Sequence, residues 1–147
     1  MVEKSRKSQA VFDVGAIAGS LPETADTMIV DYRMTDEPEA SARVFRVYRP
    51  APAHYHETCD EYLYVLSGRA MFFMGDEPPF EVRPGQLLFF KKRTIHGTPA
   101  ILESPLVVMS VDTPRRPPGD IVFVETGKYT AADFVKTQSG GAVSEGY

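Results

Sequence analysis

Proline and glycine are scattered along this chain between short apolar runs, and no other feature limits its fold so strongly. The 147 residues include 12 Pro and 11 Gly, which are not pooled in one linker. Both residues interrupt regular elements and favour turns, so a chain divided in this way is typical of an all-β domain with many short strands. We therefore predict an all-β fold in which neighbouring strands pair antiparallel.

The runs between these turns are rich in Val, Ile, Phe and Tyr, which strands prefer. Nine runs are predicted as strands: residues 27–32, 43–49, 61–66, 69–74, 80–83, 86–90, 95–102, 106–111 and 121–124. Ser67-Gly68 and Pro84-Gly85 are predicted as tight hairpin turns, because glycine adopts the positive φ that such turns require. Helical patterns occur only near the ends, at residues 12–18 and 130–136.

Length and composition indicate one domain with one hydrophobic core. A chain of 147 residues is close to the usual size of a single domain, and its 43% hydrophobic residues, with nine Phe and seven Tyr, can fill a core. The domain is expected at residues 10–136. Residues 1–9 and 137–147 are polar or small and are expected to be flexible tails.

Charge and hydropathy exclude several classes of partner. The formal net charge is -4 and the basic cluster is short (Lys4, Arg6 and Lys7), so nucleic acid is not expected as a partner. No apolar run approaches the roughly 20 residues of a membrane span, and the basic cluster is not followed by the apolar stretch of a secretory signal. The single cysteine, Cys59, cannot form an internal disulfide. We therefore expect a cytoplasmic protein without a membrane partner.

The chain has three histidines, and their spacing predicts a metal site. His54 and His56 are two residues apart, so on an extended segment both imidazoles point to the same face. Glu61 adds an anionic oxygen at the start of the next predicted strand. His96 follows a later strand that can return it to the same point. Three imidazoles and one carboxylate suit a divalent transition metal.

This arrangement resembles the two sequence motifs of the cupin superfamily. The matching residues are, in order, His54, His56, Glu61, Gly68, Pro84, Gly85 and His96. The resemblance covers residues 50–97 by motif. It implies a small single-domain cupin of the type-2 kind, which is a double-stranded β-helix or jelly-roll barrel, here with short terminal helices. It also implies that His54, His56, Glu61 and His96 are the metal ligands.

Two positions depart from the family pattern. Tyr48 stands where a glycine is usual before the first histidine, and Lys91-Lys92-Arg93 stands where a Pro-x-Gly turn is usual before the last one. Neither position is a metal ligand in the family. The positive run is expected to be a solvated turn, with attraction of an anionic substrate as the alternative.

Residues that act directly on a substrate cannot be identified from the sequence. Arg46, Tyr48 and Tyr64 are weak candidates for an acid or base beside the metal. Cys59 is expected to be a small buried side chain rather than a redox-active group or a ligand. Aromatic residues such as Phe73 and Phe90 are expected to fill the core, because small barrels are packed with side chains.

The expected function is that of a metal-dependent enzyme acting on a small polar or organic-acid-like molecule. The metal is one divalent ion of Fe, Mn, Ni, Cu or Zn. The family resemblance favours a dioxygenase slightly, with an isomerase or epimerase, a decarboxylase or a lyase as alternatives. The other class of function is a non-catalytic metal-containing barrel that binds a small molecule. The resemblance also implies a homodimer, in which residues 10–42 supply a strand edge.

Overall fold

Nine strands and two short helices make up residues 8–138, the part of the chain that our computed structural model describes. The elements are α1 (Val14–Ser20), β1 (Ile29–Glu37), β2 (Ala40–Val47), β3 (Ala51–Tyr55), β4 (Asp60–Met74), β5 (Phe80–Val82), β6 (Leu87–Phe90), β7 (His96–Thr113), β8 (Val122–Phe123), α2 (Ala131–Phe134) and β9 (Val135–Thr137). Most of the two predicted tails, residues 1–7 and 139–147, lies outside the described residues. The predicted all-β class is confirmed.

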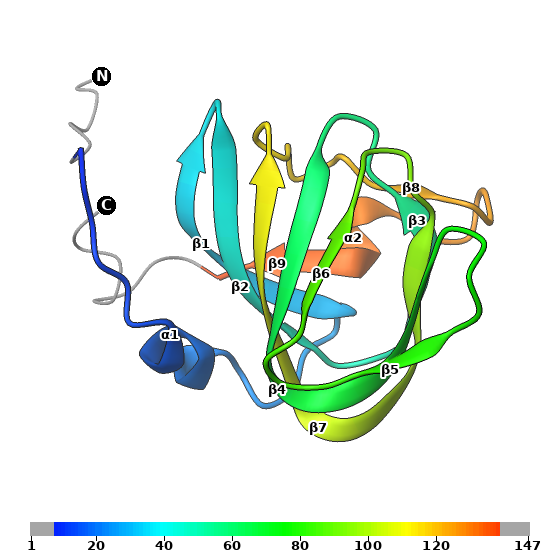
Figure 1. The fold of residues 1–147 in the computed structure, drawn as a ribbon, viewed down its shortest axis with the longest axis horizontal. Helices are drawn as coiled ribbons and strands as arrows, with labels where there is room; N and C mark the ends of the chain where they lie inside the picture. The colour runs from blue at the N-terminus through cyan, green and yellow to red at the C-terminus, as the bar shows by residue number, and fades with distance from the viewer. Residues whose placement is uncertain (1–7, 139–147) are drawn as a thin grey trace.

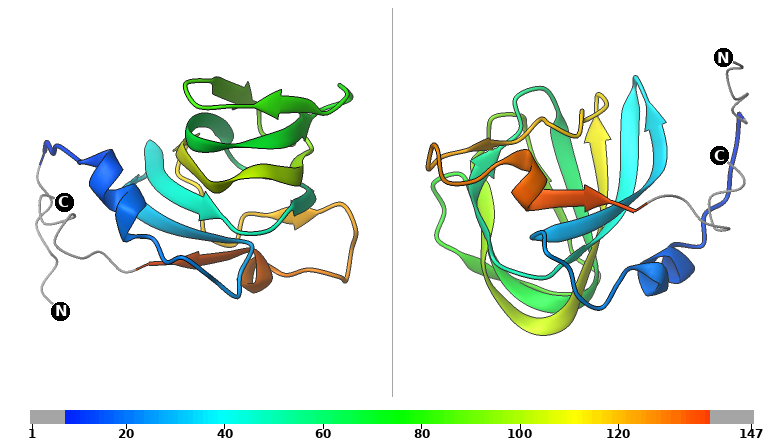
Figure 2. Two further views of the ribbon diagram at one scale, coloured as in Figure 1. Left: turned by 90° about the horizontal axis from the view of Figure 1, so that it is seen from below. Right: turned by 180° about the vertical axis from the view of Figure 1, so that it is seen from behind.

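The strands roll into a barrel because two long strands, β4 and β7, run through both of its layers. The main strand order is β5-β4-β7-β2-β1-β9, with β6 beside β4 and with β3 between β7 and β8. All pairs are antiparallel except β1 with β9. Figures 1 and 2 show the strands curling around a common interior, with α2 and β9 across the side that faces away from the viewer in Figure 1. This is the double-stranded β-helix that the sequence predicts.

The turn predicted at Ser67-Gly68 is wrong, because this dipeptide lies inside β4. The pairing of β4 with β7 shifts register on both sides of Ser67 instead of ending there. Gly68 has a φ of 82°, and a Cβ at this position would lie 2.5 Å from the carbonyl oxygen of Pro105. Only glycine permits so close an approach of β7, so the residue marks a bulge within a continuous strand. The predicted strands 95–102 and 106–111 are likewise merged, in β7.

The turn predicted at Pro84-Gly85 is present, but it does not form a hairpin. Gly85 has a φ of 91°, and Gln86 N donates to Arg83 O at 3.3 Å. The flanking strands β5 and β6 do not pair with each other; each pairs with a different part of β4. The turn therefore moves the chain from one layer of the barrel to the other.

Both predicted helices are present with shifted bounds. The Asp13 carboxylate accepts a hydrogen bond from Ala16 N at 3.0 Å and starts α1. Thr130 and Asp133 form a capping box at α2. This helix ends at Phe134 rather than at residue 136, because the chain continues as β9 and pairs with β1. Tertiary pairing thus overrides the helical pattern. No helix among residues 8–138 has the length and hydropathy to cross a membrane.

Alternation along the strands divides the apolar residues between two cores. On β2, Phe45 and Val47 point into the barrel, while Val44 points outward against α1. The outer core also contains Ile17 from α1 and Tyr32 from β1. The inner core fills most of the barrel. The same alternation places polar residues of β2, β3, β4 and β7 inside the barrel, and these residues build the site.

Candidate metal centre

The first two histidines lie at the end of β3, a strand that the sequence did not predict. This strand contains Pro52, although proline cannot donate to a strand ladder. In the structure β3 pairs with β7, with His54 opposite His96, and with β8. His54 and His56 then alternate with an outward Tyr55, so both imidazoles are buried inside the barrel as the spacing predicts.

Each histidine is oriented by a backbone carbonyl. The Nδ1 atom lies 2.7 Å from Pro52 O in His54, 2.7 Å from Asp120 O in His56 and 2.9 Å from Thr94 O in His96. A carbonyl oxygen can only accept a hydrogen bond, so each Nδ1 carries the proton and donates. The Nε2 atom of each ring is therefore the one with a free lone pair. This is the usual support of a metal-binding histidine.

The three rings converge on one point. One ring nitrogen from each of His54, His56 and His96 lies within 4.8 Å of those of the other two, and all three residues are buried. Nitrogens bound about 2.0–2.1 Å from one ion are at most about 4.2 Å apart, so small ring rotations bring the set to metal-binding distances. Within residues 8–138, neither Cys59 nor any carboxylate belongs to this mutual cluster. The donors present fit a divalent transition metal.

Burial lowers the pKa of two of the three rings, those of His54 and His96. The pKa of His54 is held well below its usual range. Removal from water is the largest cause, and the proximity of the other two histidines is the next. For His96, burial is the largest cause and the proximity of His56 the next, and together they lower its pKa to about 4. A metal binds only the deprotonated ring. His54 and His96 are therefore ready to bind a metal at neutral pH.

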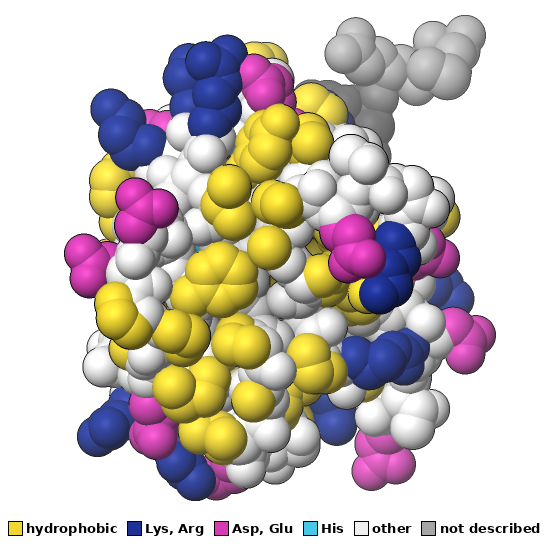
Figure 3. All heavy atoms as spheres, turned by 90° about the vertical axis from the view of Figure 1, so that its right-hand side faces the viewer, with side chains coloured by type: hydrophobic (Ala, Val, Ile, Leu, Met, Phe, Trp, Pro, Cys, Tyr) yellow, Lys and Arg dark blue, Asp and Glu magenta, His cyan; other side chains and the backbone are white. Residues whose placement is uncertain are grey.

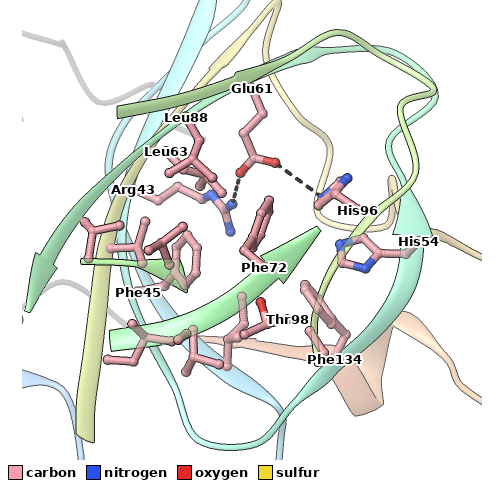
Figure 4. A pocket seen from close by; sticks show the side chains of 18 of the residues that line it. Arg43, Phe45, His54, Glu61, Leu63, Phe72, Leu88, His96, Thr98 and Phe134 are labelled. Carbon is pink, nitrogen blue, oxygen red and sulfur yellow. Dashed lines mark hydrogen bonds and ion pairs between the residues drawn. The ribbon is translucent and has the colours of Figure 1, made fainter. Parts of the chain in front are cut away.

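Glu61 lies beside two of the three histidines. Its Oε1 is 3.2 Å from His56 Nε2 and 3.9 Å from His96 Nε2, as Figure 4 shows for His96. Its Oε2 accepts hydrogen bonds from Ser110 Oγ at 2.7 Å and from Arg43 at 3.2 Å. Burial raises the pKa of Glu61, but the close approach of His56 and the positive charges of Arg43 and Arg116 outweigh burial and hold it well below its usual range. Glu61 is thus an ionised carboxylate with one oxygen aimed at the histidines.

Arg43 is a component of the site that the sequence did not reveal. It is fully buried, and its guanidinium lies 3.1 Å from Asp31, 3.2 Å from Glu61 and 3.3 Å from Asp112. The signal that could have found it is positional. Arg43 is two residues before the inward Phe45 on β2, so the two side chains point to the same face of the strand. A strand predicted over both residues therefore places the charge of Arg43 in the core.

Arg116 is the second buried arginine and comes from the loop after β7. Its backbone is held by Ser41 Oγ, which accepts from Arg116 N at 3.1 Å, and by Arg33, which donates to Arg116 O at 2.9 Å. Its Nη1 lies 3.1 Å from Nδ1 and 3.3 Å from Nε2 of His56. These two ring nitrogens point in different directions, so a donor close to both lies over the ring. The His56 lone pair therefore stays free for a metal.

Two of the histidines, His54 and His96, lie at one end of a cavity of about 60 Å³. His54, Glu61, His96, Arg43 and Arg116 form its polar part, and Figure 4 shows several of these side chains pointing into it. The rest of the wall is apolar. It consists of Ile29, Phe45, Val47, Ala51, Leu63, Val65, Ala70, Phe72, Val82, Leu88, Leu106, Val108 and Phe134, together with Thr98.

The three weak catalytic candidates do not line this cavity. Arg46 and Tyr64 have outward parity on β2 and β4, and Tyr48 packs in the outer core with its hydroxyl donating to Pro22 O at 2.7 Å. Phe90 fills the interior as expected, with its ring centroid 4.0 Å from that of His96. Phe73 faces outward and covers Gly97.

The turn before His96 forms without the glycine that is usual in the family. Thr94 N donates to Lys91 O at 3.1 Å, and Arg93 adopts a φ of 68°. Arg93 N donates to His56 O at 2.8 Å, so the turn is tied to the segment that carries the second histidine. The side chain of Arg93 is exposed and paired with Glu57. The positive run is therefore a solvated turn.

Comparison with known proteins supports this description. Residues 45–112 match the family described as "Cupin domain". No curated protein sequence matches the chain. The solved structure of KdgF from a Halomonas species is similar, with 25% identity, a TM-score of 0.55, and coverage of 60% of this chain and 81% of that one.

Two further structures share the fold at lower identity. A Klebsiella pneumoniae protein described as having a double-stranded β-helix domain is 15% identical, with a TM-score of 0.66 and coverage of 86% of this chain and 100% of that one. Pac13 from Streptomyces, described as a nucleoside dehydratase, is 15% identical, with a TM-score of 0.52 and coverage of 61% and 72%. Taken with the barrel, the family match identifies residues 45–112 as a cupin domain, whose double-stranded β-helix fold these solved structures share.

Proposed function

We propose that this protein is a metal-dependent enzyme that acts on a small molecule, with the metal held by His54, His56, His96 and Glu61. One observation carries the proposal: three buried imidazoles converge on one point, and two of them, His54 and His96, line the polar part of a cavity. A purely structural metal needs no cavity beside it. Imidazole and carboxylate donors suit Fe, Mn, Ni, Cu or Zn.

The residues around the ligands define what the protein itself contributes. A bound metal would supply a Lewis acid at the polar end of the cavity. Arg43 and Ser110 hold Glu61 Oε2 and thereby turn Oε1 toward the histidines. The apolar wall, with Leu63 and Phe72 among its members, excludes water and orients the rest of the substrate.

The cavity favours chemistry that needs no separate acid or base from the protein. Apart from the histidines, its titratable side chains are Glu61, Arg43 and Arg116. Arginine stays protonated, and Glu61 is a proposed ligand. An isomerase or a lyase requires a proton donor or acceptor beside the substrate, whereas a dioxygenase can use the metal and dioxygen. This supports a dioxygenase over the alternatives. The same fold also hosts other reactions, since Pac13 is described as a nucleoside dehydratase.

Metal content tests the site. The wild-type protein and His96→Ala are purified in parallel and their metal-to-protein ratios measured by elemental analysis. We expect a near-stoichiometric divalent metal in the wild type and its loss in the variant. Phe90→Leu is the matched control, because it alters the packing against His96 without removing a donor. Absence of metal from the wild type even after reconstitution contradicts the proposal and favours a non-catalytic binding barrel.

Oxygen consumption tests the reaction class. Protein loaded with Fe(II) without air is mixed with oxygen and a panel of candidate catechols, thiols and small organic acids. Uptake of oxygen that depends on both metal and substrate supports the dioxygenase. Turnover of substrate without oxygen uptake instead indicates a lyase or an isomerase.

A homodimer and a cytoplasmic location belong to the same proposal. Residues 29–31 of β1, which were expected to supply a dimer edge, already pair with β9. Support for a dimer comes from a side of the molecule where hydrophobic side chains gather and charged ones lie around the margin, as Figure 3 shows. Pro52, Phe73 and Pro99 line a hollow that faces outward, and Val122 and Val124 are exposed. Two copies related by a twofold axis can join such uncharged surfaces without like-charge repulsion. Light scattering at micromolar concentration checks the mass.

A further inference from the structure

The charges buried around the metal centre do not balance. Arg43 and Arg116 are positive, whereas Asp31, Glu61 and Asp112 are negative when ionised, and all five are at most 3% exposed. Histidines that bind a metal are neutral. The buried cluster therefore carries one net negative charge without a metal and one net positive charge with a divalent ion. The loaded site thus favours a ligand with a single negative charge.

Arg116 is the less compensated of the two arginines. Arg43 donates to Asp31 and Glu61 through its two terminal nitrogens and lies 3.3 Å from Asp112. By contrast, the only carboxylate within 4.0 Å of the Arg116 guanidinium, among the residues that the structure describes, is Asp112 at 4.0 Å. The Nε of Arg116 has no hydrogen-bond partner. A buried guanidinium in this state is costly unless a further group completes it.

Arg116 also has access to a ligand. It lines the same cavity as His54 and His96, and its Nη1 lies over the ring of His56. Its backbone is fixed by Ser41 and Arg33, so the side chain is held in place before any ligand arrives. Among the common anionic groups of small metabolites, a planar guanidinium matches carboxylate and phosphate best.

The dimensions of the cavity limit the size of that ligand. A cavity of about 60 Å³ holds about four to six groups of the size of a water molecule, at 10–15 Å³ for each. A sugar phosphate or a nucleotide exceeds this volume, whereas a short carboxylic acid fits it. Away from the arginines the wall is apolar, with Leu63, Phe72 and Leu88 facing the space. A hydrocarbon tail can lie there without leaving a polar group unpaired.

We propose that the substrate or inhibitor class of this site is a short-chain monocarboxylate, with its carboxylate bound by Arg116 and its hydrocarbon part against Leu63, Phe72 and Leu88. This inference rests on the proposed metal site and adds the chemistry of the ligand to it. Arg116 contacts the ligand directly, whereas Arg43 positions Glu61.

Calorimetric titration of Co(II)-loaded protein with propanoate and with propanamide tests the proposal. The two probes have nearly the same size and shape but differ in charge. We expect propanoate to bind at least about tenfold more tightly, because a hydrogen bond to a charged group is stronger than one to a neutral group. Metal-free protein is expected to show no preference for the anion.

Two neighbouring arginines supply the matched variants. Arg116→Gln should remove most of the preference for propanoate, and Arg116→Lys should retain part of it because the charge remains. Arg115→Gln should leave the preference unchanged, since Arg115 is partly exposed and pairs with Asp36. Cobalt content and far-UV circular dichroism of each variant show whether it has folded and loaded.

The outcomes separate this inference from the proposed function. Failure of the wild type to bind cobalt overturns the metal site itself. Cobalt binding without a preference for propanoate over propanamide overturns only the inference. So does a preference that survives in a folded, loaded Arg116→Gln protein, because the metal alone then accounts for it.

Discussion

The two ends of the barrel interior are built from the same strands but have opposite chemistry. On β4, Glu61 lies at the polar end, and Leu63 and Val65 follow on the same face toward the apolar end. Similarly, β2 passes from Arg43 to Phe45. On each strand, the next inward-facing residue, two positions further along, is therefore apolar instead of charged. Function and stability are divided along each strand rather than between separate strands.

The polar end contains groups that a stability-driven core would avoid. Arg43 Nε, Arg116 Nε and both carboxylate oxygens of Asp112 are buried without a hydrogen bond. Burial, followed by the charge of Glu61, raises the pKa of Asp112. The apolar end has no such cost. We interpret the polar end as a site that is retained for binding, supported by the packing of the apolar end.

The largest effect on stability is expected from Arg43→Met. The change leaves Asp31, Glu61 and Asp112 as buried carboxylates without their shared cation, which should reduce the free energy of unfolding by about 3–5 kcal/mol. Urea denaturation of the metal-free protein at neutral pH measures it. A loss below 1 kcal/mol would show that these carboxylates are not held by Arg43.

Leu63→Ala tests the apolar end in the same strand. Such a substitution usually lowers the free energy of unfolding by about 2–5 kcal/mol. We expect a loss in the lower half of this range, because Leu63 already borders a cavity. The ratio of bound metal to protein should stay unchanged. If metal content falls together with stability, the two ends are not independent and the comparison fails.

A smaller effect is expected from Ser110→Ala, which removes the 2.7 Å hydrogen bond to Glu61 Oε2. Loss of such a supporting group should weaken metal binding by about tenfold. Competition with a chelator measures the affinity. Ser67→Ala is the control, because the exposed Ser67 hydroxyl donates to Pro105 O rather than to a residue of the site and its loss should leave metal affinity as in the wild type.

The smallest effect is expected at Asp36, outside the barrel interior. Burial raises the pKa of Asp36, but hydrogen bonds and charge from Arg115 and Arg33 together outweigh burial and lower it. A lowered pKa in the folded state stabilises the protein above the unfolded-state pKa, and this contribution disappears as the pH falls through the folded-state value. Asp36→Asn should therefore cost less than about 1 kcal/mol at pH 7 and nothing at pH 2, by urea denaturation. An equal loss at both pH values would contradict this origin.

The sequence predicted most of the fold because strand periodicity is local. The merged strands β4 and β7 were divided in the prediction, since Gly68 has the φ of a turn but serves a bulge that only the neighbouring strand explains. The strand β3, which contains Pro52, was missed. The residues proposed as metal ligands could be found from spacing, and Arg43 from its parity with Phe45, whereas Arg116 could not. The burial of Arg116 depends on contacts with residues distant in the sequence, such as Ser41.

The parallel pairing of β1 with β9 has a consequence for the order in which the protein assembles during synthesis. Ile29 of β1 pairs with Val135 of β9. Phe134, which comes just before Val135, forms part of the cavity wall, and its ring centroid lies 5.1 Å from that of His54. During synthesis, all three histidines emerge from the ribosome well before residues 134–137 do. We therefore expect the imidazoles to be open to metal while the chain is still growing, and the last described strand to close the wall behind them.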